Sequence, residues 1–243
     1  MIASVGADLS SKLKLFFITF WIPRFFNIKI RIKKFGKTVT IVLRSWSDLA
    51  VFEAIFVNEE YHIDLKEEPG IIFDLGSNVG FAAIYFKLKY PNAKIFCFEP
   101  DPRTFQHLSE NISQFTNVFL FNIAVGSENG EDNFWILPDG LGSSLVKRDQ
   151  ATAVLKRECK TIDKVMEILS VDQIDLLKFD IEGAEFNVFK HFKNIFKVDN
   201  FIGEVHLDLI NENKETFLNL FKDFSLQLVG ISPKRFLLRA QKE

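Results

Sequence analysis

Three carboxylates follow one apolar run in the stretch LLKFDIEGAE, residues 176–185. Asp180, Glu182 and Glu185 fall within six residues, directly after a run that has the composition of a buried strand. Carboxylates in this position can take a proton from a substrate, bind a cation, or begin the helix that follows. A helix-start charge explains Glu185 best and Asp180 least, so Asp180 is the strongest candidate for a chemical role.

Two further acids end apolar runs earlier in the chain. Asp74 lies in FDLGSNVG and Glu99 lies in FCFEPD, 25 residues later. If both runs are parallel strands, their carboxyl ends meet at the sheet edge where doubly wound folds bind ligands. An acid in the position of Glu99 can accept both hydroxyls of a ribose. Together the two acids predict a nucleoside-binding crevice.

A glycine loop follows Asp74. Gly76 and Gly80 frame this loop, where the backbone can approach a ligand closely and the next helix offers free N–H groups. The hydroxyl of Ser77 and the amide of Asn78 are available to polar atoms of the ligand. Asn78 stands where a dinucleotide fingerprint has its second glycine, and no G-K-[ST] follows. Neither an NAD-type loop nor a P-loop is therefore predicted.

The elements that must position these residues alternate between strand and helix. The predicted strands of this rhythm are 71–76, 93–101, 117–126, 174–180 and 201–206. The predicted helices are 80–90, 102–115, 161–169, 184–196 and 214–222. Such repetition implies a mostly parallel sheet with right-handed crossovers. The last two strands, 225–231 and 235–240, are predicted to be antiparallel, and residues 128–160 read as an insertion near the site.

The first 68 residues precede this rhythm. Residues 13–28 are apolar and aromatic, but their unbroken apolar part, 15–22, is shorter than the roughly 20 residues of a spanning helix. We expect a helix packed on the protein, with contact to a membrane surface, or a signal or anchor, as the alternatives. Apolar residues alternate with polar ones on both sides of Gly36, which predicts a β-hairpin. A helix is predicted over residues 45–61.

Composition and charge narrow the classes of partner. The chain has 243 residues and a formal net charge of −2, so no nucleic-acid partner is expected. Its two cysteines, Cys97 and Cys159, lie far apart and have no metal-binding spacing. This pattern fits a reduced, cytoplasmic protein, peripheral on a membrane if residues 13–28 contact one.

Four motifs resemble those of the FkbM-type methyltransferases: FDLGSNVGFAAIYF, FCFEPDP, NIAVGSENG and DLLKFDIEGAEFNVF. The resemblance covers about residues 53–206, and the last motif is the most specific. It implies S-adenosylmethionine as methyl donor and a hydroxyl as the usual acceptor, on sugars, polysaccharides or polyketide-type products.

The resemblance also implies the class I methyltransferase fold, a Rossmann-like α/β structure. We therefore expect a mostly parallel seven-stranded sheet with an antiparallel last strand, helices on both faces, and an N-terminal helix and β-hairpin extension. The cofactor-binding domain would be residues 69–243, and residues 1–68 would be the extension.

The resemblance also assigns roles to residues. Asp74 would lie near the methionine amino group of the cofactor, and Asn122 and Ala124 would border its adenine. The full set predicted to bind the cofactor is Asp74, Gly76, Ser77, Asn78, Gly80, Glu99, Pro100, Asp101, Asn122, Ala124 and Asp180.

Transfer of a methyl group to a hydroxyl also needs a group that takes the proton. Asp180, Glu204 and His206 end neighbouring predicted strands and are the candidate catalytic residues. Histidine titrates near neutral pH, which suits a base, although His206 also fits a hydrogen-bonded structural role. We expect no metal; the alternative is Mg²⁺ held by Asp180, Glu182, Glu204 and His206.

Other functions remain as alternatives. The missing dinucleotide fingerprint argues against an NAD-dependent oxidoreductase. A methyltransferase that acts on a lipid, a nitrogen or a nucleic acid shares the fold, but the fourth predicted strand ends in KFDIEG, without a D-P-P-Y-like tetrapeptide. A non-catalytic relative would not need the intact acids Asp74, Glu99 and Asp180. The sequence does not indicate which small molecule or glycan accepts the methyl group, or the oligomeric state.

Overall fold

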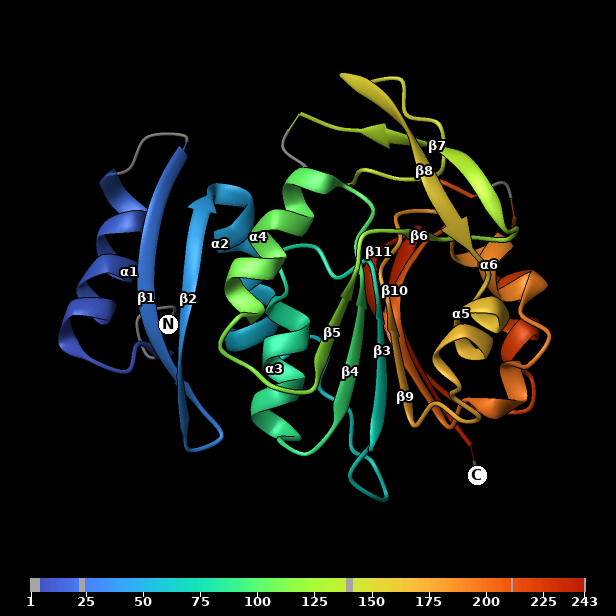
Figure 1. Cartoon of the computed structure of the whole chain (residues 1–243), viewed down its shortest axis with the longest axis horizontal. Coiled ribbons are helices and arrows are strands. Elements are labelled where there is room, and N and C mark those ends of the chain that lie inside the picture. The colour runs from blue at the N-terminus through green and yellow to red at the C-terminus, as the bar shows by residue number, and fades with distance from the viewer. Residues whose placement is uncertain (1–4, 22–24, 139–141, 211, 243) are drawn as a thin grey trace.

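The computed structural model describes residues 5–21, 25–138, 142–210 and 212–242, with the backbone alone for residues 16–21, 25 and 26. Its centre is a seven-stranded sheet in the order β11-β12-β10-β9-β3-β4-β5 (Figure 1). The strands are β3 (Ile71–Leu75), β4 (Lys94–Phe98), β5 (Val118–Phe121), β9 (Leu176–Phe179), β10 (Asn200–His206), β11 (Ser225–Ser232) and β12 (Arg235–Gln241). All neighbours are parallel except β12, which runs antiparallel to both β10 and β11. The sheet is the predicted one, with an antiparallel last strand.

Burial on both faces explains why the inner segments form parallel strands. The residues of β9 are buried throughout, and those of β3 nearly so, because helices cover the sheet on each side. Figure 1 shows α3 and α4 on one side and α5 and α6 on the other. These helices, with α7, are α3 (Phe81–Lys89), α4 (Pro102–Ile112), α5 (Ile162–Leu169), α6 (Glu185–His191) and α7 (Lys214–Leu218). The predicted helix 184–196 is too long: α6 ends at His191, and a separate 3-10 turn covers Ile195–Lys197.

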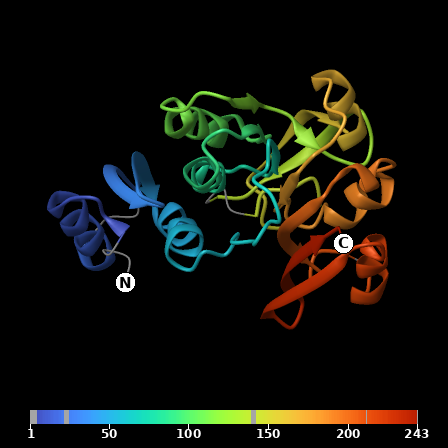
Figure 2. The same ribbon diagram turned by 90° about the horizontal axis from the view of Figure 1, so that it is seen from below.

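The N-terminal segment forms the predicted helix and hairpin, which lie together at one end of the molecule (Figures 1 and 2). The elements are α1 (Leu9–Trp21), β1 (Phe25–Lys34), β2 (Lys37–Ser45) and α2 (Trp46–Phe52), which continues as a π-helix over Glu53–Val57. The buried side chains of the hairpin belong to the same apolar cluster as those of α3. None of the helices within the described residues has the length and apolar character to cross a membrane. Of the segment predicted to contact a membrane surface, residues 22–24 lie outside the described residues.

A small second sheet lies across the carboxyl ends of the parallel strands (Figure 1). Its order is β6-β8-β7, with β6 (Ala124–Val125), β7 (Gly130–Ile136) and β8 (Ala153–Lys160). The prediction of one strand over 117–126 is therefore wrong. The main-sheet strand β5 ends at Phe121, and Ala124 and Val125 pair instead with β8. The turn between them is fixed by Asn122, whose side-chain amide donates to the carbonyl of Glu99 at 2.8 Å.

Candidate functional site

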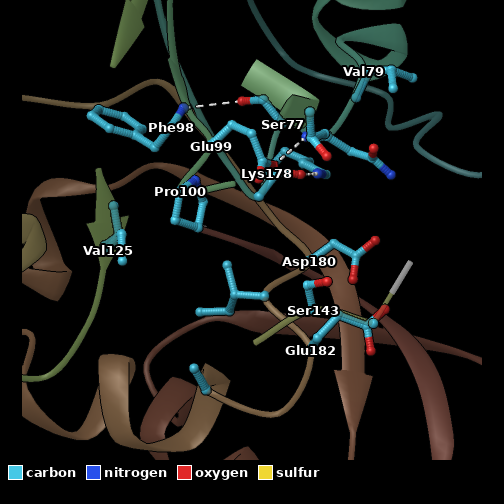
Figure 3. Close-up of a pocket in the computed structure, with 18 of the residues that line it drawn as sticks. Ser77, Val79, Phe98, Glu99, Pro100, Val125, Ser143, Lys178, Asp180 and Glu182 are labelled. Atoms are coloured by element: carbon cyan, nitrogen blue, oxygen red, sulfur yellow. Dashed lines mark hydrogen bonds between the residues drawn. The ribbon is translucent and has the colours of Figure 1, made fainter. Parts of the chain in front are cut away.

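A pocket of about 910 Å³, open to solvent, lies where β3, β4 and β9 end and the small sheet begins (Figure 3). The predicted residues that line it are Gly76, Ser77, Asn78, Glu99, Pro100, Ala124 and Asp180. The predicted residues outside its lining, among those the structure describes, are Asp74, Gly80, Asp101, Asn122, Glu204 and His206. The sequence thus predicted the place of the pocket but also named residues that lie behind its wall.

The glycine loop forms one wall of the pocket and is held tightly against the sheet. Gly76 has a φ of +72°, and a Cβ there would lie 1.9 Å from the carbonyl oxygen of Asp180. The hydroxyl of Ser77 donates to the carbonyl of Asp74 at 2.8 Å and accepts from the amide of Phe98 at 3.0 Å. Both of these bonds stabilise the loop, and the predicted contact of this hydroxyl with a ligand stays a prediction.

Gly80 lies where two helices, α3 and α4, pack closely. It precedes α3 with a φ of +89°, and a Cβ there would lie 2.7 Å from Cδ1 of Leu108 in α4. Gly80 thus allows α4 to pack against the start of α3. Asp101 also has a structural contact, since it caps α4 by accepting from the amide of Arg103 at 3.0 Å.

Glu99 occupies the position predicted for a ribose acceptor. Its two carboxylate oxygens accept from the backbone amides of Asn78 and Asp101, each at 2.9 Å. These amides fix the carboxylate at the pocket wall while leaving further lone pairs on both oxygens. Burial raises the pKa of Glu99 to about 7, although the two amide donors favour its charged form. A ligand that donates hydrogen bonds here would therefore stabilise the carboxylate.

Asp74 is fully buried and has a protein partner in place of a ligand. Its carboxylate lies 3.0 Å from Nζ of Lys178, which also donates to the carbonyl of Gly76 at 2.8 Å. Lys178 lines the pocket and Asp74 does not, so the ammonium group next to this acid belongs to the protein. Burial opposes that charge, but Asp74 and Asp180 together hold the pKa of Lys178 above its usual value. Sequence analysis missed Lys178, although a lysine inside the buried run LLKFD was a signal.

The rest of the lining comes from segments that sequence analysis did not connect to the site. An apolar wall is formed by Val125 and Phe134 from the small sheet and by Leu145 from the insertion. The wall opposite to it includes Val51, Ile55 and Tyr61, from the region between the hairpin and the main sheet. No motif marks these residues, because their role depends on long-range packing.

The acidic stretch after β9 forms a cluster with the end of β10. The Oδ2 atom of Asp180 accepts from the hydroxyl of Tyr61 at 3.1 Å. The Nε2 atom of His206 lies 3.5 Å from Oε2 of Glu182, 3.9 Å from Oδ1 of Asp180 and 3.4 Å from Oε1 of Glu204. The structure thus brings together the residues predicted to act at this edge. Asp180 and Glu182 line the pocket, and His206 lies behind them, fully buried.

Glu185 has a partner that the sequence did not reveal. It begins α6, as predicted, but its side chain is fully buried and its Oε1 atom lies 2.9 Å from Nδ1 of His206. The same oxygen accepts from the amide of Gly183 at 3.1 Å. Interpreting Glu185 as a helix-start charge alone was therefore incomplete. Its contact with a residue 21 positions away depends on the tertiary fold.

The surrounding carboxylates change the titration of His206. Burial lowers its pKa, but Glu185, Asp180 and Glu182 outweigh this effect and raise the pKa to about 9. Burial, followed by the charge of Asp180, raises the pKa of Glu182 and of Glu204 to about 7. With no ligand present, His206 is therefore charged at neutral pH and lies outside the pocket lining. This arrangement does not favour the predicted role of His206 as a base.

Comparison with known proteins identifies the family of this chain. The model of the methyltransferase FkbM domain matches residues 74–224, more than half of the chain. A solved structure described as methyltransferase FkbM from Methylobacillus flagellatus superposes with a TM-score of 0.50 and 13% identity. That likeness covers 72% of this chain and 44% of the other, and it shows that the two share a fold.

Two curated relatives carry more specific descriptions. The 2-O-methyltransferase NoeI of Sinorhizobium fredii is 29% identical over 160 residues, which cover 58% of this chain and 65% of NoeI. The hexuronic acid methyltransferase AglP of Haloferax volcanii is 31% identical over 149 residues, which cover 59% of each chain. The present chain therefore spans about three fifths of the length of these two relatives.

Proposed function

The chain belongs to the FkbM methyltransferase family, and from this premise we propose that it transfers a methyl group from S-adenosylmethionine to a hydroxyl of a sugar or glycan. The observation that carries the proposal is a single pocket whose wall holds both Glu99 and Asp180. The descriptions of NoeI and AglP as a 2-O-methyltransferase and a hexuronic acid methyltransferase support the choice of acceptor.

The residues of the pocket fit the proposed cofactor. S-adenosylmethionine, when bound, supplies a methyl group on a positively charged sulfonium. The carboxylate of Glu99 accepts the ribose hydroxyls, and the apolar side chains of Ala124, Val125 and Phe134 provide a wall for the adenine. The carboxylates of Asp180 and Glu182 lie at the same pocket (Figure 3) and favour a cationic ligand by direct attraction.

Asp180 is the group that takes the proton of the acceptor hydroxyl. It lines the pocket, whereas the other predicted catalytic residues, His206 and Glu204, lie behind it. The hydroxyl of Tyr61 holds one carboxylate oxygen, and Oδ1 has no hydrogen-bond partner within the described part of the chain. Proton transfer to Asp180 as the carbon–oxygen bond forms is general base catalysis. His206 is a positioning residue, since its Nε2 atom lies 3.5 Å from Glu182 and 3.9 Å from Asp180, and Glu204 acts through His206, at 3.4 Å from the same nitrogen.

A binding experiment tests the cofactor assignment. We expect calorimetry to show one S-adenosylmethionine site, no binding of NAD, and an affinity about 10- to 100-fold weaker in Glu99→Gln, because glutamine keeps one acceptor oxygen and loses one hydrogen bond to a charged group. Glu131→Gln, which changes an exposed acid of β7, is the matched control and should bind as the wild type does. Absence of S-adenosylmethionine binding to the wild type would contradict the proposed function.

A transfer experiment tests the acceptor. Incubation with labelled S-adenosylmethionine and a panel of sugars, hexuronic acids and oligosaccharides should give a methyl ether, located by mass spectrometry. Transfer only to lipids, amines or nucleic acid would refute the acceptor class while retaining the enzyme class. Binding of the cofactor with no transfer to any acceptor would favour a non-catalytic relative.

A further inference from the structure

We propose that Asp180, Glu182 and His206 bind one divalent transition-metal ion at the edge of the pocket. Each of the three offers one ligand atom, and these atoms all lie within 4.8 Å of one another. The inference deepens the proposed function and rests on it only for what the ion does to the acceptor.

The distances in the cluster are close to those of a coordination sphere. Ligand atoms about 2.1 Å from one ion lie about 3.0 to 3.5 Å apart when they are adjacent in an octahedron or tetrahedron. The Nε2 atom of His206 lies 3.5 Å from Glu182 and 3.9 Å from Asp180. The third pair, Asp180 and Glu182, lies within 4.8 Å, so binding of an ion would draw these two carboxylates closer together.

His206 is the observation that distinguishes this cluster from a group of surface acids. Its side chain is fully buried, and its Nδ1 atom is held by Glu185 at 2.9 Å. Its Nε2 atom has no hydrogen-bond partner among the residues that the structure describes, and it lies toward the carboxylates. A histidine with one ring nitrogen bonded to a carboxylate and the other left open is the arrangement found around bound metals.

The charges of the cluster also favour a cation. Asp180, Glu182, Glu185 and Glu204 all approach His206 within 4 Å. Two arginines oppose them from the outside: Arg148 lies 3.1 Å from Glu182, and Arg235 lies 3.9 Å from Glu204. Once the imidazole is neutral, as a metal ligand must be, four ionised carboxylates against two guanidinium groups leave a negative excess that a divalent ion would neutralise.

The site is closed on the protein side and open on the pocket side. His206 lies behind the wall, whereas Asp180 and Glu182 are part of it and lie next to each other in Figure 3. Three protein ligands leave coordination positions for water or substrate, which is typical of catalytic metal sites. An acceptor hydroxyl bound there would have its pKa lowered by the ion.

The donor set indicates which ion binds. Mg²⁺ and Ca²⁺ prefer oxygen ligands alone, while imidazole together with carboxylates suits Mn²⁺ and the later transition metals. Mg²⁺, the ion considered from the sequence, is therefore the weaker fit. Glu204 is not a member of the mutual group of three, although its Oε1 atom lies 3.4 Å from Nε2 of His206.

Titration of the full-length protein with Mn²⁺ tests this inference. After dialysis against chelator, free Mn²⁺ measured by electron paramagnetic resonance should show one bound ion per chain. Glu182→Gln and His206→Gln should each weaken binding at least tenfold. Asp208→Asn is the matched control, because Asp208 is an exposed acid that pairs with Arg235 nearby but lies outside the cluster. Far-ultraviolet circular dichroism confirms folding, and Glu182→Gln decides the result if His206→Gln fails to fold.

Each result separates this inference from the proposed function. No stoichiometric Mn²⁺ binding at millimolar concentration, or equal binding by Glu182→Gln and the wild type, would overturn the metal site, and calorimetry with S-adenosylmethionine would still report on the function. Mn²⁺ binding that depends on Glu182, in a protein without affinity for S-adenosylmethionine, would retain the metal site and refute the function. Full methyl transfer in excess chelator would overturn the catalytic use of the ion.

Discussion

Glu99 accepts a hydrogen bond from the backbone of the glycine loop and is also predicted to bind the cofactor. Its carboxylate is held by the amides of Asn78 and Asp101, so it is fixed before any ligand arrives. A fixed acceptor loses little entropy on binding, which favours affinity. Because burial raises the pKa of this carboxyl to about 7, its charge changes within the range of ordinary assays.

We therefore predict that affinity for S-adenosylmethionine rises with pH through 7. Ribose hydroxyls donate to the carboxylate, so only the ionised form of Glu99 binds well. With a pKa of about 7, the ionised fraction falls about tenfold between pH 8 and pH 6, and the affinity should fall by the same factor. Calorimetry at several pH values measures this change. Glu99→Gln should lack this component of the pH dependence, and an identical profile in both proteins would assign the titration to another group.

Residue types alone predicted the acids of the site better than their partners. Asp180 and Glu99 could be found because an acid at the end of an apolar strand is rarely there for packing. Lys178 and the partner of Glu185 were missed because each contact joins residues distant in sequence: Lys178 pairs with Asp74 of β3, and Glu185 with His206 at the end of β10. The sequence therefore identifies the charged groups, but which of them form ion pairs depends on the tertiary fold.

At the scale of elements, the contact between the glycine loop and the end of β9 limits how far the site can change. Gly76 lies so close to the carbonyl of Asp180 that no side chain fits between them. The loop and the end of β9 are thus held at a fixed separation by the backbone alone.

Gly76→Ala should therefore unfold the site. A Cβ would lie 1.9 Å from a backbone oxygen, and the residue also has a φ of +72°. We expect a loss of at least about 3 kcal/mol of stability, measured by urea unfolding, together with loss of S-adenosylmethionine binding. Gly36→Ala is the control for conformation alone, because Gly36 has a φ of +73° with no atom within 4 Å. It should cost about 1 kcal/mol, and a similar cost at both positions would refute the steric argument.

Elements differ in how well the sequence predicts them. The runs that became β3, β4 and β9 were recognisable because both of their faces are buried, and such runs read as continuously apolar. Strand β8 was missed because most of its residues are exposed, so it has no apolar pattern. The division of the third predicted strand at Asn122 was missed because the break is stabilised by a side chain from β8: Arg157 donates to the carbonyl of Asn122 at 2.7 Å.

At the scale of the whole molecule, the N-terminal hairpin and the methyltransferase sheet share one apolar cluster. Ile30, Ile41 and Leu43 of the hairpin belong to the same cluster as Ile84 and Phe86 of α3. The predicted boundary at residue 69 therefore crosses this cluster. Segments that share a core usually unfold together.

Ile41→Ala tests whether the two parts form one cooperative unit. Ile41 is fully buried, so its truncation should cost about 2 to 5 kcal/mol. If the core is shared, circular dichroism and tryptophan fluorescence should show one coincident transition with a lower midpoint. Val154→Ala, which shortens an exposed side chain of β8, is the control and should leave the midpoint nearly unchanged. An early separate transition of the hairpin would show that residues 1–68 unfold independently.

The pairing of β6 with β8 has a consequence for the segment that joins them. Ala124 pairs with Cys159, Val125 pairs with Lys160, and the amide of Gly126 donates to the carbonyl of Lys160 at 3.0 Å. The segment between residues 126 and 160 therefore begins and ends at residues that are paired with each other. Segments with adjacent ends tolerate changes in length, and this one supplies Phe134, Ser143 and Leu145 to the pocket. Replacement of this segment would therefore remodel part of the pocket wall, Phe134 included, while Gly76, Glu99 and Asp180 stay in place.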